Sequence, residues 1–237
     1  MRLDKLLGLL GVATRSESKG MLKAGRVRLN GEIARDGAAS VLPGAAVEVD
    51  GNPLDTRVER WVMLNKPAGV LTAAEDKRQK TVMDLLPPVY RSLGCMPVGR
   101  LDKDTTGLLL LTTDGELAHR LIAPGRHVDK VYMATVDGVL TDADAAAFAR
   151  GVPLKDFTAL PAGLERLKPD TALVTVREGK YHQVKRMFGA VGKPVTALKR
   201  LRFGPLLLDE SLEAGQFREL TEEETAALYR AAGMGHE

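Results

Sequence analysis

Residues 99–112 read GRLDKDTTGLLLLT, a polar turn that leads directly into a short apolar run. A run of this length, bounded by turn residues, is typical of a strand buried inside a sheet. Asp102 stands just before the run, where the chain begins to be buried. A carboxylate there needs a charged or hydrogen-bonding partner, or it takes up a proton. Residues 178–188, EGKYHQVKRMF, form a basic segment that could supply this partner.

On both sides of this stretch, strand-like and helical segments mix without regular alternation. The sequence predicts strands at 61–64, 98–101, 108–112, 131–136 and 172–176, and helices at 81–86, 116–121 and 143–150. Such a mixture favours an α+β fold around a mainly antiparallel sheet. We therefore predict a large domain over residues 61–237, preceded by a polar linker at 51–60 that reads GNPLDTRVER.

The first fifty residues have the pattern of a separate small domain. Four leucines between positions 3 and 10 recur at helical spacing, and a second helix is predicted from about Ser16 until Gly25 ends it. Alternation then predicts strands near 27–29 and 47–49, and Asn30-Gly31 is a strong hairpin-turn signal. Two short helices followed by a small sheet predict a domain over residues 1–50.

The distribution of charge distinguishes the two ends of the chain, although the net charge is only +3 over 237 residues. Basic residues crowd the first thirty positions, whereas glutamates crowd the last thirty. A basic arm of this kind fits a nucleic-acid phosphate backbone. Its members are Arg2, Lys5, Arg15, Lys19, Lys23, Arg26 and Arg28.

Several classes of protein are excluded by what the sequence lacks. The apolar runs are too short to cross a bilayer, and the N-terminus has charges of both signs and no small-residue cleavage site, so we expect no signal peptide. Cys95 is the only cysteine, which excludes an intrachain disulfide and fits a reducing cytoplasm. The histidines show no metal-ligand spacing and no glycine-rich phosphate loop is present, so we expect neither a metal nor a nucleotide cofactor.

Taken together, these motifs resemble a known family. GRLDKDTTGL and EGKYHQVKRMF resemble the paired motifs of the pseudouridine synthases, specifically the RsuA branch that modifies ribosomal RNA. Residues 1–50, with RLDKLL…GVATRSESKGMLKAGRVRLNG, resemble an S4 RNA-binding domain. The resemblance extends from Met1 to about Leu228. It implies an α+β fold in which a small S4 domain precedes a catalytic domain built on a mainly antiparallel mixed sheet.

The resemblance also implies three catalytic residues. Asp102 matches the family's catalytic aspartate, Tyr132 in the KVY motif matches its active-site tyrosine, and Lys185 matches the cation that pairs with the aspartate. The tyrosine ring can stack on a flipped uracil. Much of the wider superfamily has arginine in place of this lysine, which offers one point charge instead of a fork. Arg186 is the alternative partner of Asp102, and Asp104 is interpreted as local turn chemistry.

Four residues are expected to bind the substrate, Arg186 among them. Arg100 lies two residues before Asp102, so the two share a face in an extended segment, and Arg100 is expected to fill the gap left by the extruded nucleotide or to hold its phosphates. The family's last motif places Leu198 in the uracil pocket, and Gln183 again lies two residues before a catalytic position. Two lysines are candidates for phosphate contacts: Lys66, in NKPAG, and Lys130.

The activity implied by the resemblance is site-specific isomerisation of uridine to pseudouridine in 16S ribosomal RNA, at uridine 516. The bond from ribose C1′ to N1 is broken and the ribose is rejoined to C5, which needs no cofactor but does need an ionised carboxylate in a mostly dry pocket. The expected partner is 16S ribosomal RNA or a small-subunit assembly intermediate, with no membrane and no protein partner, and the expected state is a cytoplasmic monomer. Two alternatives stay open: a 23S ribosomal RNA pseudouridine synthase of the same plan, and a non-catalytic S4-domain RNA-binding protein.

Overall fold

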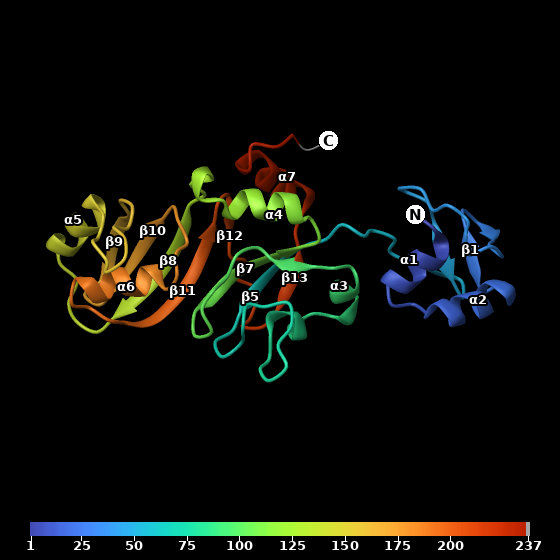
Figure 1. Cartoon of the computed structure of the whole chain (residues 1–237), viewed down its shortest axis with the longest axis horizontal. Helices are drawn as coiled ribbons and strands as arrows, with labels where there is room; N and C mark the ends of the chain where they lie inside the picture. Colours follow the sequence, from blue (N-terminus) through green and yellow to red (C-terminus); the bar gives the residue numbers. More distant parts are fainter. Residues whose placement is uncertain (236–237) are drawn as a thin grey trace. The chain divides into compact units, whose positions relative to one another are not determined.

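The computed structural model describes residues 1–235, which form two compact units (Figure 1). One unit comprises Met1–Arg60 and Leu86–Cys95, and the other comprises Trp61–Leu85 and Met96–Glu237. The last two residues of the domain predicted over 61–237 lie outside the described residues.

The smaller unit contains a four-stranded sheet and three helices, of which the third is α3 (Pro88–Ser92) in the segment Leu86–Cys95. Its other elements are α1 (Leu3–Leu9), α2 (Arg15–Lys23), β1 (Val27–Leu29), β2 (Glu32–Ile33), β3 (Val47–Val49) and β4 (Asn52–Pro53), with strand order β2-β1-β3-β4. Thr14 and Glu17 start α2 with a capping box, in which each side chain accepts the other's backbone N–H. Asn30 and Gly31 both have positive φ, as the predicted hairpin turn requires. The predicted helices and turn are therefore confirmed, while β4 lies inside the range predicted as linker.

The larger unit is built on a nine-stranded sheet. The strands are β5 (Trp61–Lys66), β6 (Met96–Pro97), β7 (Thr106–Thr112), β8 (Lys130–Val136), β9 (Gly163–Lys168), β10 (Thr171–Val176), β11 (Val195–Phe203), β12 (Leu206–Leu207) and β13 (Phe217–Glu219). Their order is β13-β5-β7-β11-β8-β10-β9, with β6 beside β7 and β12 beside β11. The β7–β11 pair is parallel and its neighbours in the sheet pair antiparallel. This confirms the predicted α+β fold on a mainly antiparallel sheet.

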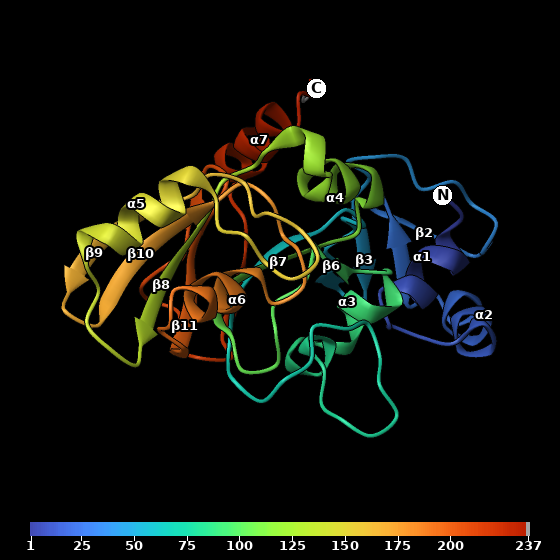
Figure 2. The same ribbon diagram turned by 60° about the vertical axis from the view of Figure 1, so that its left-hand side comes forward.

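Helices cover the sheet in two groups. α4 (Gly115–Ile122) and α7 (Glu222–Ala231) lie side by side in both views (Figures 1 and 2), and their Leu117, Leu121 and Leu228 join one apolar core with the sheet. α5 (Asp142–Arg150) packs on β9, and α6 (Gln183–Ala190) packs on β11. The short helices of this unit are η1 (Val82–Leu85) and η2 (Pro124–Arg126). Within residues 1–235, no helix combines the length and the apolar character needed to span a bilayer.

β7 and β11 approach closely at Gly107. This glycine has a φ of +96°, and a Cβ at its position would lie only 2.2 Å from the carbonyl oxygen of Arg200. Glycine therefore allows β11 to take its place in the sheet. Arg200 is buried and donates from Nε to the carbonyl oxygen of Leu108 at 2.7 Å, which closes the junction.

Two predicted elements of the larger unit differ in the structure. The strand predicted at 98–101 is wrong, because β6 ends at Pro97 and residues 98–105 form neither helix nor strand. Gly99 has a φ of +74°, a conformation of turns and not of strands. The helix predicted at 81–86 is the single 3₁₀ turn η1.

Candidate active site

Asp102 lies on the irregular loop 98–105, which residues 66–72 hold in place. The hydroxyl of Thr72 donates to the carbonyl oxygen of Leu101 at 2.8 Å and accepts from the Leu101 N–H at 3.2 Å. The N–H of Gly69 donates to the carbonyl oxygen of Lys103 at 2.8 Å. The NKPAG segment and the residues after it therefore fix the backbone on both sides of Asp102.

Lys66 is the strongest anchor of this loop. It is fully buried, and its ammonium donates to three carbonyl oxygens, those of Pro67 (3.0 Å), Lys103 (3.2 Å) and Thr105 (2.9 Å). Burial lowers the pKa of Lys66 to about 8. The phosphate contact considered for Lys66 is therefore wrong, because its charge is directed into the protein.

Lys130 is also buried, so its predicted phosphate contact is wrong as well. Its ammonium donates to the carbonyl oxygen of Val128 at 2.8 Å and lies 5.3 Å from the centre of the Phe203 ring. Burial, together with the nearby charge of Arg200, lowers the pKa of Lys130 to about 8. Both lysines support the sheet and the loop from inside.

The depressed pKa of Lys130 predicts a pH-dependent stability. Between pH 8 and 10.5 the unfolded chain holds a proton on this amine that the folded chain does not, so the free energy of unfolding rises with pH across that window. Relative to Lys130→Met, the wild type should gain stability there by up to roughly 1.4 kcal/mol per pH unit. Urea unfolding at pH 7.5 and 9.5 measures this gain. The difference in stability between the wild type and Lys168→Met, at an exposed lysine of β9, should be the same at both pH values. An equal difference between the wild type and Lys130→Met at both pH values would contradict the prediction.

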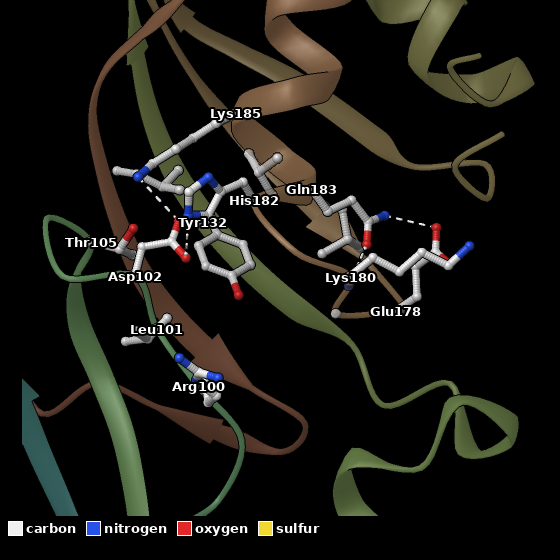
Figure 3. Close-up of a pocket in the computed structure, with 14 residues that line it drawn as sticks. Arg100, Leu101, Asp102, Thr105, Tyr132, Glu178, Lys180, His182, Gln183 and Lys185 are labelled. Carbon is white, nitrogen blue, oxygen red and sulfur yellow. Dashed lines mark hydrogen bonds and ion pairs between the residues drawn. The ribbon is translucent and has the colours of Figure 1, made fainter. Parts of the chain in front are cut away.

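Lys185, on the first turn of α6, links two carboxylates of the loop. Its Nζ lies 3.1 Å from Oδ2 of Asp102 and 2.5 Å from Oδ1 of Asp104. Nε2 of His182 lies 3.5 Å from the other carboxylate oxygen of Asp102 (Figure 3). Lys185 and Asp102 are about a quarter exposed, whereas Asp104 is 74% exposed. The structure therefore brings the predicted pair together, and Asp104 contributes more than local turn chemistry.

Charge and hydrogen bonding shift the pKa values of Lys185 and Asp104. Burial alone would lower the pKa of Lys185, but hydrogen bonds to Asp104 and Asp102 and the charges of both carboxylates outweigh it, so the pKa of Lys185 is raised. The hydrogen bond from Lys185 holds the pKa of Asp104 below its usual range. The cluster is an ammonium shared between an inner and an outer carboxylate.

The start of α6 decides which side chains reach Asp102. His182 precedes the helix in a left-handed conformation, with a φ of +50°, and the helix then rotates successive residues by about 100°. Gln183 is buried, and its amide is used within the protein: it donates to Glu178 at 2.8 Å and accepts the N–H of Lys180 at 3.0 Å. Gln183 therefore supports the turn before α6.

Arg186 is the predicted substrate-binding residue that the structure does not bring to the site. Its guanidinium pairs with Asp156 and lies 5.1 Å from the centre of the Phe157 ring. One helical step separates Arg186 from Lys185, and this step is enough to turn it toward a different loop. Arg186 is therefore neither the partner of Asp102 nor a lining residue of the hollow beside it.

A small hollow of about 60 Å³ lies beside Asp102. Six of the predicted site residues line it: Arg100, Asp102, Tyr132, Gln183, Lys185 and Leu198. Tyr132, on β8, is largely buried, whereas Arg100 is exposed. Thr105, which sequence reasoning missed, also lines the hollow, and its buried hydroxyl has no hydrogen-bond partner among residues 1–235. An unpaired buried hydroxyl is a group that a ligand can satisfy.

The basic residues predicted to bind RNA are all exposed on the smaller unit. Arg15 and Lys19 line a hollow of about 300 Å³ together with Arg35. Two of the seven are paired with acids: Arg2 with Asp4 and Arg26 with Asp50, each at 2.6 Å. The remaining five are Lys5, Arg15, Lys19, Lys23 and Arg28, which leaves a net basic surface on this unit. No three His, Cys, Asp or Glu side chains in residues 1–235 are grouped so as to hold a metal ion.

Comparison with known proteins matches both units. The family model of RNA pseudouridylate synthases matches residues 60–190, and that of the S4 domain matches residues 1–53. The chain is 46% identical to the uncharacterized RNA pseudouridine synthase YtzG of Bacillus subtilis, over 94% of this chain and 96% of the relative. It is 43% identical to ribosomal small subunit pseudouridine synthase A of Salmonella typhimurium, over 96% of this chain and 100% of the relative. A crystal structure of a pseudouridylate synthase aligns with a TM-score of 0.68 at 36% identity, covering 96% of this chain and 99% of that one.

Proposed function

The chain belongs to the family of RNA pseudouridylate synthases, and from this premise we propose that it converts one uridine of 16S ribosomal RNA, uridine 516, to pseudouridine. The observation that carries the proposal is the ion pair between Asp102 and Lys185 beside Tyr132 in one hollow. The relative from Salmonella typhimurium, which this chain matches over its whole length, is named as a small-subunit enzyme.

The reaction is an isomerisation, so the atomic composition of the nucleotide does not change. The bond from ribose C1′ to N1 breaks, the base turns, and C1′ is joined to C5; N1 gains a proton and C5 loses one. We assign the covalent step to Asp102, at the ribose or at the base, because Lys185 keeps a partly desolvated carboxylate available as a nucleophile. Tyr132 stacks on the flipped base and exchanges protons with it, Leu198 lines the uracil pocket, and the unpaired hydroxyl of Thr105 bonds the nucleotide.

Recognition of the RNA is divided between the two units. We assign residues 1–50 to gripping phosphates through their exposed cations, residues 51–60 to the linker, and residues 61–237 to catalysis. Arg100, which is exposed at the rim of the hollow, fills the gap left by the flipped nucleotide or holds its phosphates. We propose that the protein acts as a monomer in the cytoplasm, on 16S ribosomal RNA or a partly assembled small subunit, without a protein partner.

Release of tritium from C5 tests this activity, because only C5 loses its hydrogen in the reaction. The wild-type protein is mixed with small-subunit ribosomal RNA transcribed with [5-³H]uridine, and in parallel with small-subunit particles from a strain that lacks the gene and was grown with [5-³H]uridine. The proposal expects tritium in the water from at least one of these substrates, and a single modified position when the RNA is mapped. No release from either would contradict it.

The two alternatives give different results in the same experiments. A 23S enzyme of the same plan would release tritium from large-subunit RNA and would leave a 23S position unmodified in the deletion strain. A non-catalytic S4-domain protein would bind RNA and release none. The shared ammonium of Lys185 favours catalysis, since two carboxylates beside it only weaken the attraction for a phosphate backbone.

A further inference from the structure

Tyr181 is a solvent-exposed aromatic side chain beside the candidate active site. It is 76% exposed, although the same unit has an extensive apolar core. Its ring lies parallel to the imidazole of His182, with ring centres 3.8 Å apart and planes 18° apart. One face of the tyrosine ring is therefore covered by His182, which leaves the other face available to a planar group.

His182 connects this stacked pair to the catalytic acid. Its Nε2 lies 3.5 Å from Asp102, and its left-handed backbone sets the direction in which α6 begins. A non-glycine residue in this conformation is uncommon and recurs at functional sites. The imidazole thereby lies between Asp102 on one side and the Tyr181 ring on the other, so only one side chain separates the exposed ring from Asp102.

A second hollow, of about 570 Å³, lies beside the first and is lined by the stacked pair. The two hollows share six lining residues, among them Arg100, Asp102 and His182. The larger hollow is also lined by residues 71–73, Asp76 and Lys103. Arg100 is exposed and has no hydrogen bond or ion pair to a residue of the described chain, so its guanidinium is available to a phosphate.

We propose that Tyr181 and His182 form a stacking platform for an unpaired base of the RNA, that of a nucleotide next to the uridine being modified. An aromatic face, a free guanidinium and a hollow that opens onto the catalytic acid are the features that bind a single-stranded nucleotide. Flipping the target uridine unstacks its neighbours, and the platform replaces part of the lost stacking. The inference rests on the proposed function and adds a second nucleotide subsite to it.

The test uses Tyr181→Ala, with Tyr181→Phe to keep the ring and Leu207→Ala as a matched exposed apolar control. KM and kcat are measured by tritium release from the small-subunit RNA that the wild type modifies. Tyr181→Ala should raise KM between about 5- and 150-fold, the factor that one stacked base represents, with kcat within about threefold. Tyr181→Phe and Leu207→Ala should stay within about threefold of the wild type in both constants.

A second set of RNAs identifies the base. Splinted ligation places an abasic residue immediately 5′ or 3′ of the modified uridine. On one of the two RNAs the wild-type KM should rise by the same factor as in Tyr181→Ala, and the substitution should then add nothing further. An unchanged KM in Tyr181→Ala, an equal effect of the substitution on intact and both abasic RNAs, or an effect seen on ribosomal particles but not on free RNA would each overturn the inference. Absence of tritium release by the wild type would instead contradict the proposed function.

Discussion

Replacement of Asp102 with asparagine is expected to lower tritium release by at least about a thousandfold, while affinity for the same RNA stays within about threefold. Asparagine keeps the size and planar shape of the side chain but cannot form the covalent bond or carry its charge. Removing a negative charge from an RNA-binding surface creates no new repulsion, so binding is preserved. Single-turnover tritium release gives the rate, and filter binding to unlabelled RNA gives the affinity.

Asp104→Asn is the matched control for this substitution. Asp104 contacts the same ammonium as Asp102, two residues away, but it is 74% exposed. Lys185 keeps Asp102 as its partner in the variant, so activity should stay within about tenfold of the wild type. Continued tritium release by Asp102→Asn, or an equally large loss in Asp104→Asn, would show that the catalytic carboxylate has been assigned to the wrong residue.

Loss of the cation is expected to have the second largest effect. Lys185→Met should lower kcat by at least about a hundredfold, because the partly buried carboxylate of Asp102 then lacks its counter-charge and is no longer held in position. Circular dichroism and the urea midpoint distinguish this loss from unfolding. Lys168→Met, at an exposed lysine of β9, should change neither kcat nor the urea midpoint.

Lys185→Arg separates charge from shape at this position. A guanidinium restores the counter-charge with a different geometry, so kcat should recover to within about tenfold of the wild type. The pKa of Lys185 is raised above its ordinary value of 10.5, so the ammonium stays charged throughout pH 7 to 9. The ratio of the wild-type rate to that of Lys185→Arg should therefore be constant over this range. A ratio that changes with pH would mean that Lys185 titrates and acts as an acid or base.

Much of the fold could be predicted because local patterns agree with tertiary packing. The helical spacing of the leucines in α1, the Asn30-Gly31 turn and the apolar run in β7 each leave one reasonable local structure. β11 could not be predicted from its pattern, because three cations interrupt it and one of them, Arg200, is buried. Helix α6 is likewise hidden, since its start depends on a left-handed histidine that composition does not reveal.

The pairing of the two charged residues in the site could be predicted from the sequence motifs, but the surroundings of the other cations could not. The pairing of Asp102 with Lys185 follows from the resemblance, and the structure places the two side chains in contact. Lys66 and Lys130 look like surface cations in sequence, because nothing local shows that carbonyl oxygens surround them. The direction of the Arg186 side chain depends on where α6 begins, because each helical residue is rotated by about 100° from the one before it.

The position of β11 has a consequence for how the enzyme is made. Asp102 precedes β7, and Tyr132 belongs to β8. In the sheet, β11 lies between β7 and β8 and pairs with both, yet it is synthesised after both of them. A nascent chain that stops before residue 195 therefore contains two half-sheets with open edges and lacks Leu198, which lines the hollow beside Asp102. Insertion of β11 closes both edges and completes the hollow, so we expect an incomplete chain to be prone to aggregation.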